Sequence, residues 1–179
     1  MATGGILDNC TISDVVNADN SSVIYVNSAQ GGFDKGSKVV NCAIFGSDQN
    51  GAVLNPMAGN TAYNTPLTVC FRGCATKVPI QITYEKKAQN LQGTYTADES
   101  NIVADPEDCF VDAAKGDFRP LKEGSLVDKG VTTGPGSSTF ALALPQADFA
   151  GNPRVVGSSV DIGCYEVFSA VNGLMILLH

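Results

Sequence analysis

Three charged residues in the first hundred are of types that could support catalysis: Arg72, Asp34 and Asp48. Carboxylates can hold a calcium ion, and a basic side chain can abstract a proton from a substrate bound beside it. Arg72 is the only arginine before residue 100, so it is the candidate base, with Asp48 or Asp34 as its carboxylate partner. Solvated charges in turns explain the same three residues without any reaction.

Several other kinds of site lack their residues. The single histidine is His179, which argues against a Ser-His-Asp triad or a metal site of several histidines. The formal net charge is −7, and an acidic chain repels phosphate backbones, so nucleic acid is not an expected partner. Asp105, Asp108 and Asp112 lie close in sequence, but they do not form an EF-hand loop, and turn capping accounts for them.

Contact with sugars is the second chemistry to consider. Sugar sites often stack on aromatic rings, and the chain has no tryptophan. Tyr25 and Tyr63 are the candidate ligand-binding residues, because both lie near strands or loops of the first half. Phe71 lies there too, but phenylalanine more often faces a core.

A repeat in the first half must position these residues. Residues 7–13 and 39–45 share the pattern aliphatic-x-Asn-Cys-x-Ile at a spacing of 32 residues, and residues 67–71 read as a degraded third copy in which Val69 replaces the asparagine. Asparagine tolerates the left-handed backbone conformation, so Asn9 and Asn41 suit a sharp bend between two short strands. One such unit cannot bury its apolar face, so the units are expected to stack as a parallel β-helix. A β-sandwich also has many short strands, but it does not explain an Asn-Cys pair that returns at this period.

The repeat also accounts for some of the six cysteines. Cys10 and Cys42 are expected to stack inside as small buried hydrophobes. Cys70 and Cys74 are the one local pair that could close a disulfide, and no spacing fits a zinc site.

The second half is richer in sharp turn motifs. Residues 160–164 alternate apolar and polar side chains, which predicts a strand with one apolar face. Arg119 and Arg154 are expected to bond to Asp128 or Asp161 and to fasten the end of the stack. The motifs themselves are Asp-Pro-Glu-Asp-Cys-Phe-Val-Asp at 105–112, Gly-Asp-Phe-Arg at 116–119, Val-Asp-Lys-Gly at 127–130, Asp-Phe-Ala-Gly-Asn-Pro-Arg at 148–154 and Val-Asp-Ile-Gly-Cys-Tyr-Glu at 160–166.

This order of motifs resembles the C-terminal portion of bacterial surface proteins of the choice-of-anchor Q domain type, which belong to the pectate-lyase-like superfamily of right-handed parallel β-helices. The upstream Asn-Cys repeats look like that family as well. Leu126 stands where the family usually has proline, and Cys164 where it usually has alanine.

The resemblance implies an all-β fold: a right-handed parallel β-helix, or solenoid, of a few coils with a C-terminal cap. Residues 1–100 would form the coils, 101–168 the last coils and the cap, and 169–179 a tail. The implied function is a non-catalytic segment of a secreted or cell-surface protein, engaged in adhesion or contact with a polysaccharide or cell-surface glycan. The alternative is a polysaccharide lyase or glycoside hydrolase acting on pectin-like polymers, and only that alternative would call for a cofactor, calcium.

The two ends of the sequence give little further information on location or function. No signal peptide is visible at the start, so the extracellular location rests on the resemblance. The apolar run 174–178 is far shorter than the roughly 20 residues that span a bilayer, so no membrane span is expected.

Overall fold

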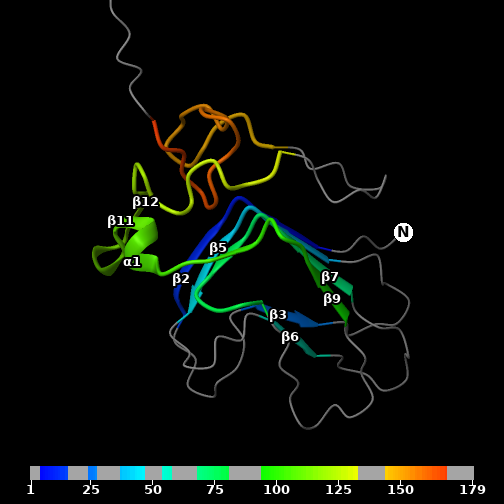
Figure 1. Cartoon of the computed structure of the whole chain (residues 1–179). Coiled ribbons are helices and arrows are strands. Elements are labelled where there is room, and N and C mark those ends of the chain that lie inside the picture. Colours follow the sequence, from blue (N-terminus) through cyan, green and yellow to red (C-terminus); the bar gives the residue numbers. More distant parts are fainter. Residues whose placement is uncertain are drawn as a thin grey trace, which may run out of the picture.

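The computed structural model describes residues 5–15, 24–27, 37–46, 54–57, 68–80, 94–132 and 144–168. Figure 1 shows these ranges in colour. The candidates Asp34, Asp48 and Tyr63 lie outside them, as does the tail 169–179.

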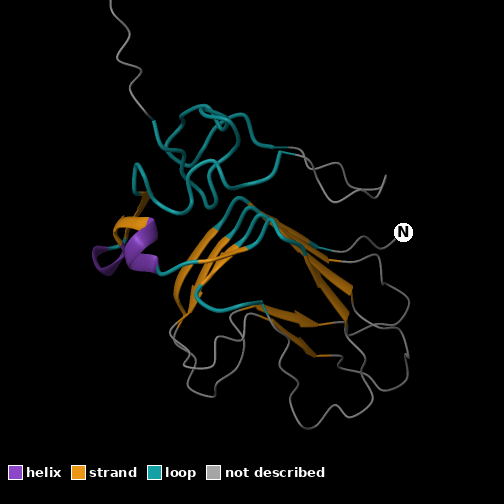
Figure 2. Ribbon diagram, in the orientation of Figure 1, coloured by secondary structure: helices purple, strands orange, loops and turns teal. Residues whose placement is uncertain are grey.

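Parallel strands from successive repeats build most of the described structure. One four-stranded sheet has the order β1-β4-β7-β9, a second has the order β10-β8-β5-β2, and β3 pairs with β6. The two larger sheets converge at a row of bends, drawn as loops in Figure 2. The bounds are β1 (Ile6–Asp8), β2 (Thr11–Val15), β3 (Ile24–Asn27), β4 (Ser37–Val40), β5 (Ala43–Gly46), β6 (Leu54–Met57), β7 (Thr68–Arg72), β8 (Ala75–Thr76), β9 (Thr94–Ala97) and β10 (Ile102–Val103).

The predicted register of the first two repeats is confirmed. Leu7 pairs with Val39 and Ile12 with Ile44, so the two copies stack residue on residue. Asn9 and Asn41 have φ values of 49° and 52°, the left-handed conformation expected at the bend.

The assignment of the third copy was wrong by four residues. Val39 pairs with Phe71 and Ala43 with Ala75, so the third bend lies at Gly73 and Cys74. Gly73 has a φ of 59° and takes the place of the asparagine. Glycine adopts this conformation without a side-chain penalty, which is why the third bend does not need asparagine.

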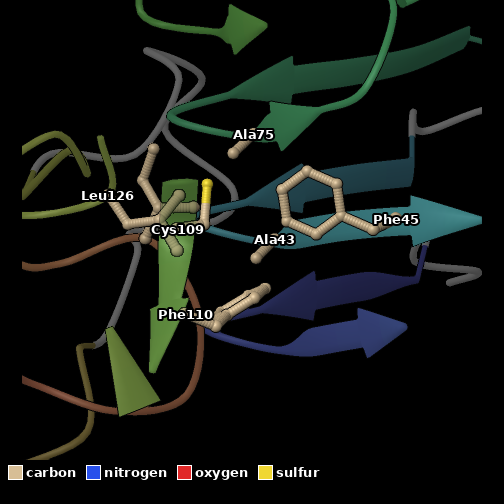
Figure 3. Packing of buried hydrophobic residues seen from close by; sticks show 7 residues of the cluster. Ala43, Phe45, Ala75, Cys109, Phe110 and Leu126 are labelled. Carbon is tan, nitrogen blue, oxygen red and sulfur yellow. The ribbon is translucent and has the colours of Figure 1, made fainter. Parts of the chain in front are cut away.

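Two apolar clusters fill the space between the elements. The first lies between the parallel sheets and includes Val39, Ile44 and Phe71. The second joins the sheets to the second half of the chain (Figure 3). In it, the Phe45 and Phe110 rings meet edge to face at 5.6 Å, a favoured aromatic geometry.

After β10 the chain leaves the parallel arrangement. Asp105 caps the short helix α1 (Pro106–Cys109) by accepting a hydrogen bond from the Glu107 amide. Then β11 (Phe110–Asp112) and β12 (Asp117–Pro120) form an antiparallel pair, joined by η1 (Ala113–Lys115) and a left-handed Gly116. A connection this short can join only antiparallel strands.

The prediction of a closed β-helix with a C-terminal cap is therefore wrong. The described strands form two parallel sheets, a parallel pair and an antiparallel pair, and no closed solenoid can be followed through them. The physical reason lies in the second half: its Asp-, Gly- and Pro-rich motifs form turns and a hairpin, which cannot continue a parallel ladder. Helix is scarce in these ranges, and none of it is long and apolar enough to cross a membrane.

The strand predicted over 160–164 is also wrong. This segment has no strand, and the four residues Val160 to Gly163 are all buried rather than alternating. The segment packs between the bends of the parallel sheets and residues 126–130. The Gly163 amide donates to the Asn41 carbonyl, and the Ile162 amide donates to the Leu126 carbonyl.

All six cysteines are free thiols, so Cys70 and Cys74 do not form the disulfide considered above. Cys42 is buried in the repeat core as predicted, whereas Cys10, at the first bend, is half-buried. Burial also raises the pKa of the Cys109 thiol, to about 12, with help from the nearby Asp108 and Asp105 carboxylates.

Candidate binding groove

Arg72, the candidate base, lies at the end of β7 and forms an ion pair with Asp98. Its Nε is 2.8 Å from the Asp98 Oδ2, and both side chains are partly exposed. Asp34 and Asp48 fall outside the described ranges, so the structure does not place them against Arg72. The ion pair thus engages the guanidinium that the candidate base would have to offer to a substrate.

The other sequence candidates are distributed as follows. The Tyr25 backbone lies in β3, but its side chain is not described. Asp105 caps a helix as expected, whereas Asp112 makes no side-chain capping bond and pairs with Lys115 at 2.6 Å. Within the described ranges no three His, Cys, Asp or Glu residues come together as metal ligands would.

A groove lies where the β11–β12 hairpin meets the C-terminal segment. It is open to solvent and has a volume of about 320 Å³. The hairpin contributes one wall, and the turns around residues 150 and 165 contribute the other. Its lining residues are Val111, Arg119, Pro120, Ala150, Asn152, Tyr165, Glu166, Val167 and Phe168.

Aromatic rings border this groove. Tyr165 lines it and is held edge to face by Phe149, with the ring centroids 5.6 Å apart. Phe149 is 79% exposed and Phe168 58% exposed. Tyr165 and Phe168 thus line the groove, and Phe149 extends this aromatic surface beyond its edge.

Arg119 and Asn152 provide the polar groups of the walls. Two nitrogens of the Arg119 guanidinium bond to the two carboxylate oxygens of Asp117, which lowers the pKa of that carboxyl. The Asn152 amide nitrogen donates to Asp148. Both groups are thus oriented by a neighbour before any ligand arrives, which reduces the ordering that binding would require.

Glu166 forms the floor of the groove, with its carboxylate turned into the protein. The side chain is only 1% exposed and lies 3.0 Å from the Arg154 guanidinium. Burial raises the pKa of Glu166 to about 8, and the nearby Asp161 and Asp148 carboxylates act in the same direction. Burial also raises the pKa of Asp161.

Arg154 joins this floor to the first repeat. One of its terminal nitrogens donates to the Asn9 Oδ1 at 2.7 Å and to the carbonyls of Asp161 and Gly163. The prediction that Arg154 bonds to Asp161 holds through the Asp161 backbone carbonyl rather than its carboxylate, whereas the same prediction for Arg119 is wrong. Arg119 pairs with the nearer Asp117, whereas the Asp161 carboxylate is occupied by the amides of Asp128 and Val167.

The turn at 148–152 positions the aromatic rings. The Asp148 carboxylate accepts from the amides of Ala150, Asn152 and Glu166, as a turn-forming aspartate is expected to do. These bonds lower the pKa of Asp148 despite its burial. They also tie the turn that carries Phe149 to the segment that carries Tyr165.

Sequence reasoning missed Phe149, Tyr165 and Phe168. A signal was present: Phe149 stands between an aspartate and Ala-Gly-Asn, inside a turn motif where no apolar side chain is needed. The choice of Tyr25 and Tyr63 assumed that the stacked repeats would present the ligand surface.

A second hollow, of about 550 Å³, lies beside residues 121–125 and Asp108. Its charged groups are Asp108, Lys122 and Glu123, and no aromatic residue lines it. It is therefore less suited to a sugar than the groove.

No protein-family model matches this chain, and no curated protein and no solved structure is detectably similar to it. The resemblance to the choice-of-anchor Q type of surface protein thus stays an expectation from the motifs.

Proposed function

We propose that the chain is a non-catalytic, glycan-contacting segment of a secreted or cell-surface bacterial protein, and that the groove beside β11–β12 is its contact site. The observation that carries this proposal is the aromatic border, formed by the exposed ring of Phe149 packed against Tyr165 with Phe168 nearby. The electron-rich face of an aromatic ring favours the C–H face of a pyranose, and an apolar wall with a few oriented polar groups is typical of small-ligand sites.

Charge indicates which glycans would bind. The chain has a net charge of −7, and the groove's cation, Arg119, is already paired with Asp117. A polyuronate would be repelled by the protein's overall field and would have to compete for Arg119. We therefore expect neutral sugars to bind in preference to acidic, pectin-like polymers.

The binding test compares a panel of neutral and uronic polysaccharides with the purified chain and three variants. F168A removes an exposed ring that lines the groove, and F149A removes the exposed ring that packs on Tyr165, so each should weaken binding to neutral glycans at least tenfold. V103A is the matched control, because Val103 is 59% exposed but lies on β10, away from the groove. Equal binding by F149A, F168A and the wild type would contradict the proposal.

The same panel tests the enzymatic alternative. Unsaturated products, followed by ultraviolet absorbance with and without calcium, would indicate a lyase, and new reducing ends alone would indicate a hydrolase. Either product would contradict a purely binding role. R72A then decides whether the candidate base is responsible for the unsaturated product.

A further inference from the structure

Asn152 presents an oriented hydrogen-bond acceptor in the wall of the groove. Its backbone amide and its Nδ2 both donate to the Asp148 carboxylate, at 2.8 and 3.1 Å, and its carbonyl accepts from the Asp148 amide. An ionised carboxylate can only accept, so these bonds distinguish Nδ2 from Oδ1 in the Asn152 side chain. The Oδ1 has no hydrogen-bond partner within the described ranges, so it is the atom left to accept from a ligand.

Arg119 presents an oriented donor from the hairpin wall. Its Nε and Nη2 bond to the two carboxylate oxygens of Asp117, at 2.8 and 2.5 Å. The remaining nitrogen, Nη1, has no such bond in the part of the chain that the structure describes, and a guanidinium nitrogen only donates. Because the Asp117 carboxylate offsets the positive charge, this donor does not call for an anionic ligand.

Most of the remaining lining is apolar. Val111 and Phe168 line the groove and are 48% and 58% exposed, and the other apolar lining residues are Pro120, Ala150 and Val167. The volume of about 320 Å³ lies at the small end of the roughly 300–1,000 Å³ of small-ligand sites. These walls therefore favour a compact ligand group that combines a donor, an acceptor and a small apolar part.

The acetamido group of an N-acetylhexosamine has these three parts in a neutral form. We propose that the groove selects glycans that contain N-acetylhexosamine units, an inference that rests on the proposed function because it names the sugar class for the same site. The acetamido N–H donates to the Asn152 Oδ1, its carbonyl accepts from the Arg119 Nη1, and its methyl group packs against Val111 and Phe168. A plain hexose has a hydroxyl in place of this group, which lacks the methyl and the second polar atom.

Chitohexaose and cellohexaose are the matched probes, because they are neutral chains of the same linkage and length that differ in the acetamido group. Calorimetric titration of the wild-type chain should give at least tenfold tighter binding of chitohexaose. N152A should abolish this preference and leave the affinity for cellohexaose within about twofold of the wild-type value, because it removes only the acceptor for the acetamido N–H. A purely structural effect on the turn would weaken both sugars alike.

R119A and K115A form the second pair of variants. Each removes a cation that pairs with a nearby aspartate, but only Arg119 lines the groove. R119A should lose the preference for chitohexaose, and K115A should keep it.

Three outcomes would overturn the proposal and leave glycan binding itself in place. They are equal affinity of the wild-type chain for both hexaoses, a preference that survives N152A or R119A, and binding of another neutral glycan but of neither hexaose. Failure of every neutral oligosaccharide to bind would overturn the proposed function as well.

Discussion

At the residue scale, the distinctive feature is a buried group of charges with more anions than cations. Asp148, Asp161 and Glu166 are all buried, and the buried cation near them is Arg154, which is 2% exposed and forms an ion pair with Glu166. Hydrogen bonds from three amides keep Asp148 ionised, whereas burial raises the pKa of the other two carboxyls. The group therefore holds a proton at pH values where exposed carboxyls have lost theirs.

This group predicts that the free energy of unfolding falls as the pH rises from about 5 to 8. In the unfolded chain Glu166 loses its proton near its ordinary pKa of 4.5, whereas in the folded chain it keeps the proton to about 8. The folded state thus binds more protons in this window, and stability declines by at most about 1.4 kcal/mol per pH unit for one group. Urea titrations at several pH values measure the slope. Below this window the trend reverses, because Asp148, with its lowered pKa, stabilises only while ionised.

E166Q assigns the slope to Glu166. Glutamine resembles the protonated carboxyl and can still accept from the Asp161 amide, so the variant should match the wild type near pH 5 and flatten the decline toward pH 8. D117N is the control, because Asp117 belongs to an exposed pair at the surface. A wild-type profile that is flat or rises from pH 5 to 8 would show that Glu166 is ionised in the folded chain.

Residue types predicted some of these roles and not others. The left-handed bends at Asn9 and Asn41 followed from the conformational freedom of asparagine, a property of the residue alone. The partners of Arg154 did not, because they include two backbone carbonyls and the side chain of Asn9, 145 positions away. Only the folded chain brings these groups together.

At the scale of elements, the bends between the two parallel sheets form the contact surface for the second half. The Asn41 side chain donates to the Val131 carbonyl and accepts from its amide, as a strand partner would. Gly73 lies beside this contact: a Cβ added there would come within 2.6 Å of the Asn41 Oδ1. The third bend therefore needs glycine for two reasons: its left-handed backbone and the close approach of the Asn41 side chain.

We expect G73A to lower the free energy of unfolding by about 3 kcal/mol, because alanine adds left-handed strain and a steric clash. G116A is the control, because Gly116 is also left-handed, with a φ of 77°, but has open space around it. We expect G116A to lower the free energy of unfolding by only about 1 kcal/mol. Chemical denaturation of both variants gives the comparison, and equal losses would mean that the contact with Asn41 is unimportant.

The sequence predicted the period and pairing of the first two repeats, but it misplaced the third repeat and led to the wrong expectation of a closed β-helix. The repeat was visible because Asn-Cys returned unchanged after 32 residues. At the third bend glycine replaced the asparagine, so the conformation persisted while the pattern was lost. The groove could not be predicted from the repeat, because its walls come from a hairpin and from turns that lie outside the repeat.

At the scale of the whole molecule, the C-terminal segment is fastened across the first repeats by bonds that span most of the chain. Arg154 reaches Asn9, and the Cys164 amide donates to the Thr11 hydroxyl. In Figure 1 this segment, drawn in orange, lies over the bends of the parallel sheets. Loss of these bonds should disturb the groove as well as the fold, because Glu166 lines the groove and also pairs with Arg154.

R154K tests this attachment. Lysine keeps the charge but cannot bond to Asn9, two carbonyls and Glu166 at once, so we expect a loss of about 2 kcal/mol or more in the free energy of unfolding. R119K is the control, because Arg119 pairs with Asp117 at the surface and should cost less than about 1 kcal/mol. Similar losses from both would contradict a fastening role for Arg154.

The most direct test of the proposed function is the aromatic NMR spectrum of the folded chain during titration with neutral oligosaccharides. The chain has 8 phenylalanines, 5 tyrosines and no tryptophan, so single ring signals can be assigned through the F149A and F168A variants. A groove that binds neutral sugars should give saturable shifts of the Phe149, Tyr165 and Phe168 signals with a neutral sugar, and none with a uronate of equal length. Unchanged ring signals across all neutral sugars, or shifts confined to rings outside the groove, would contradict the proposed function.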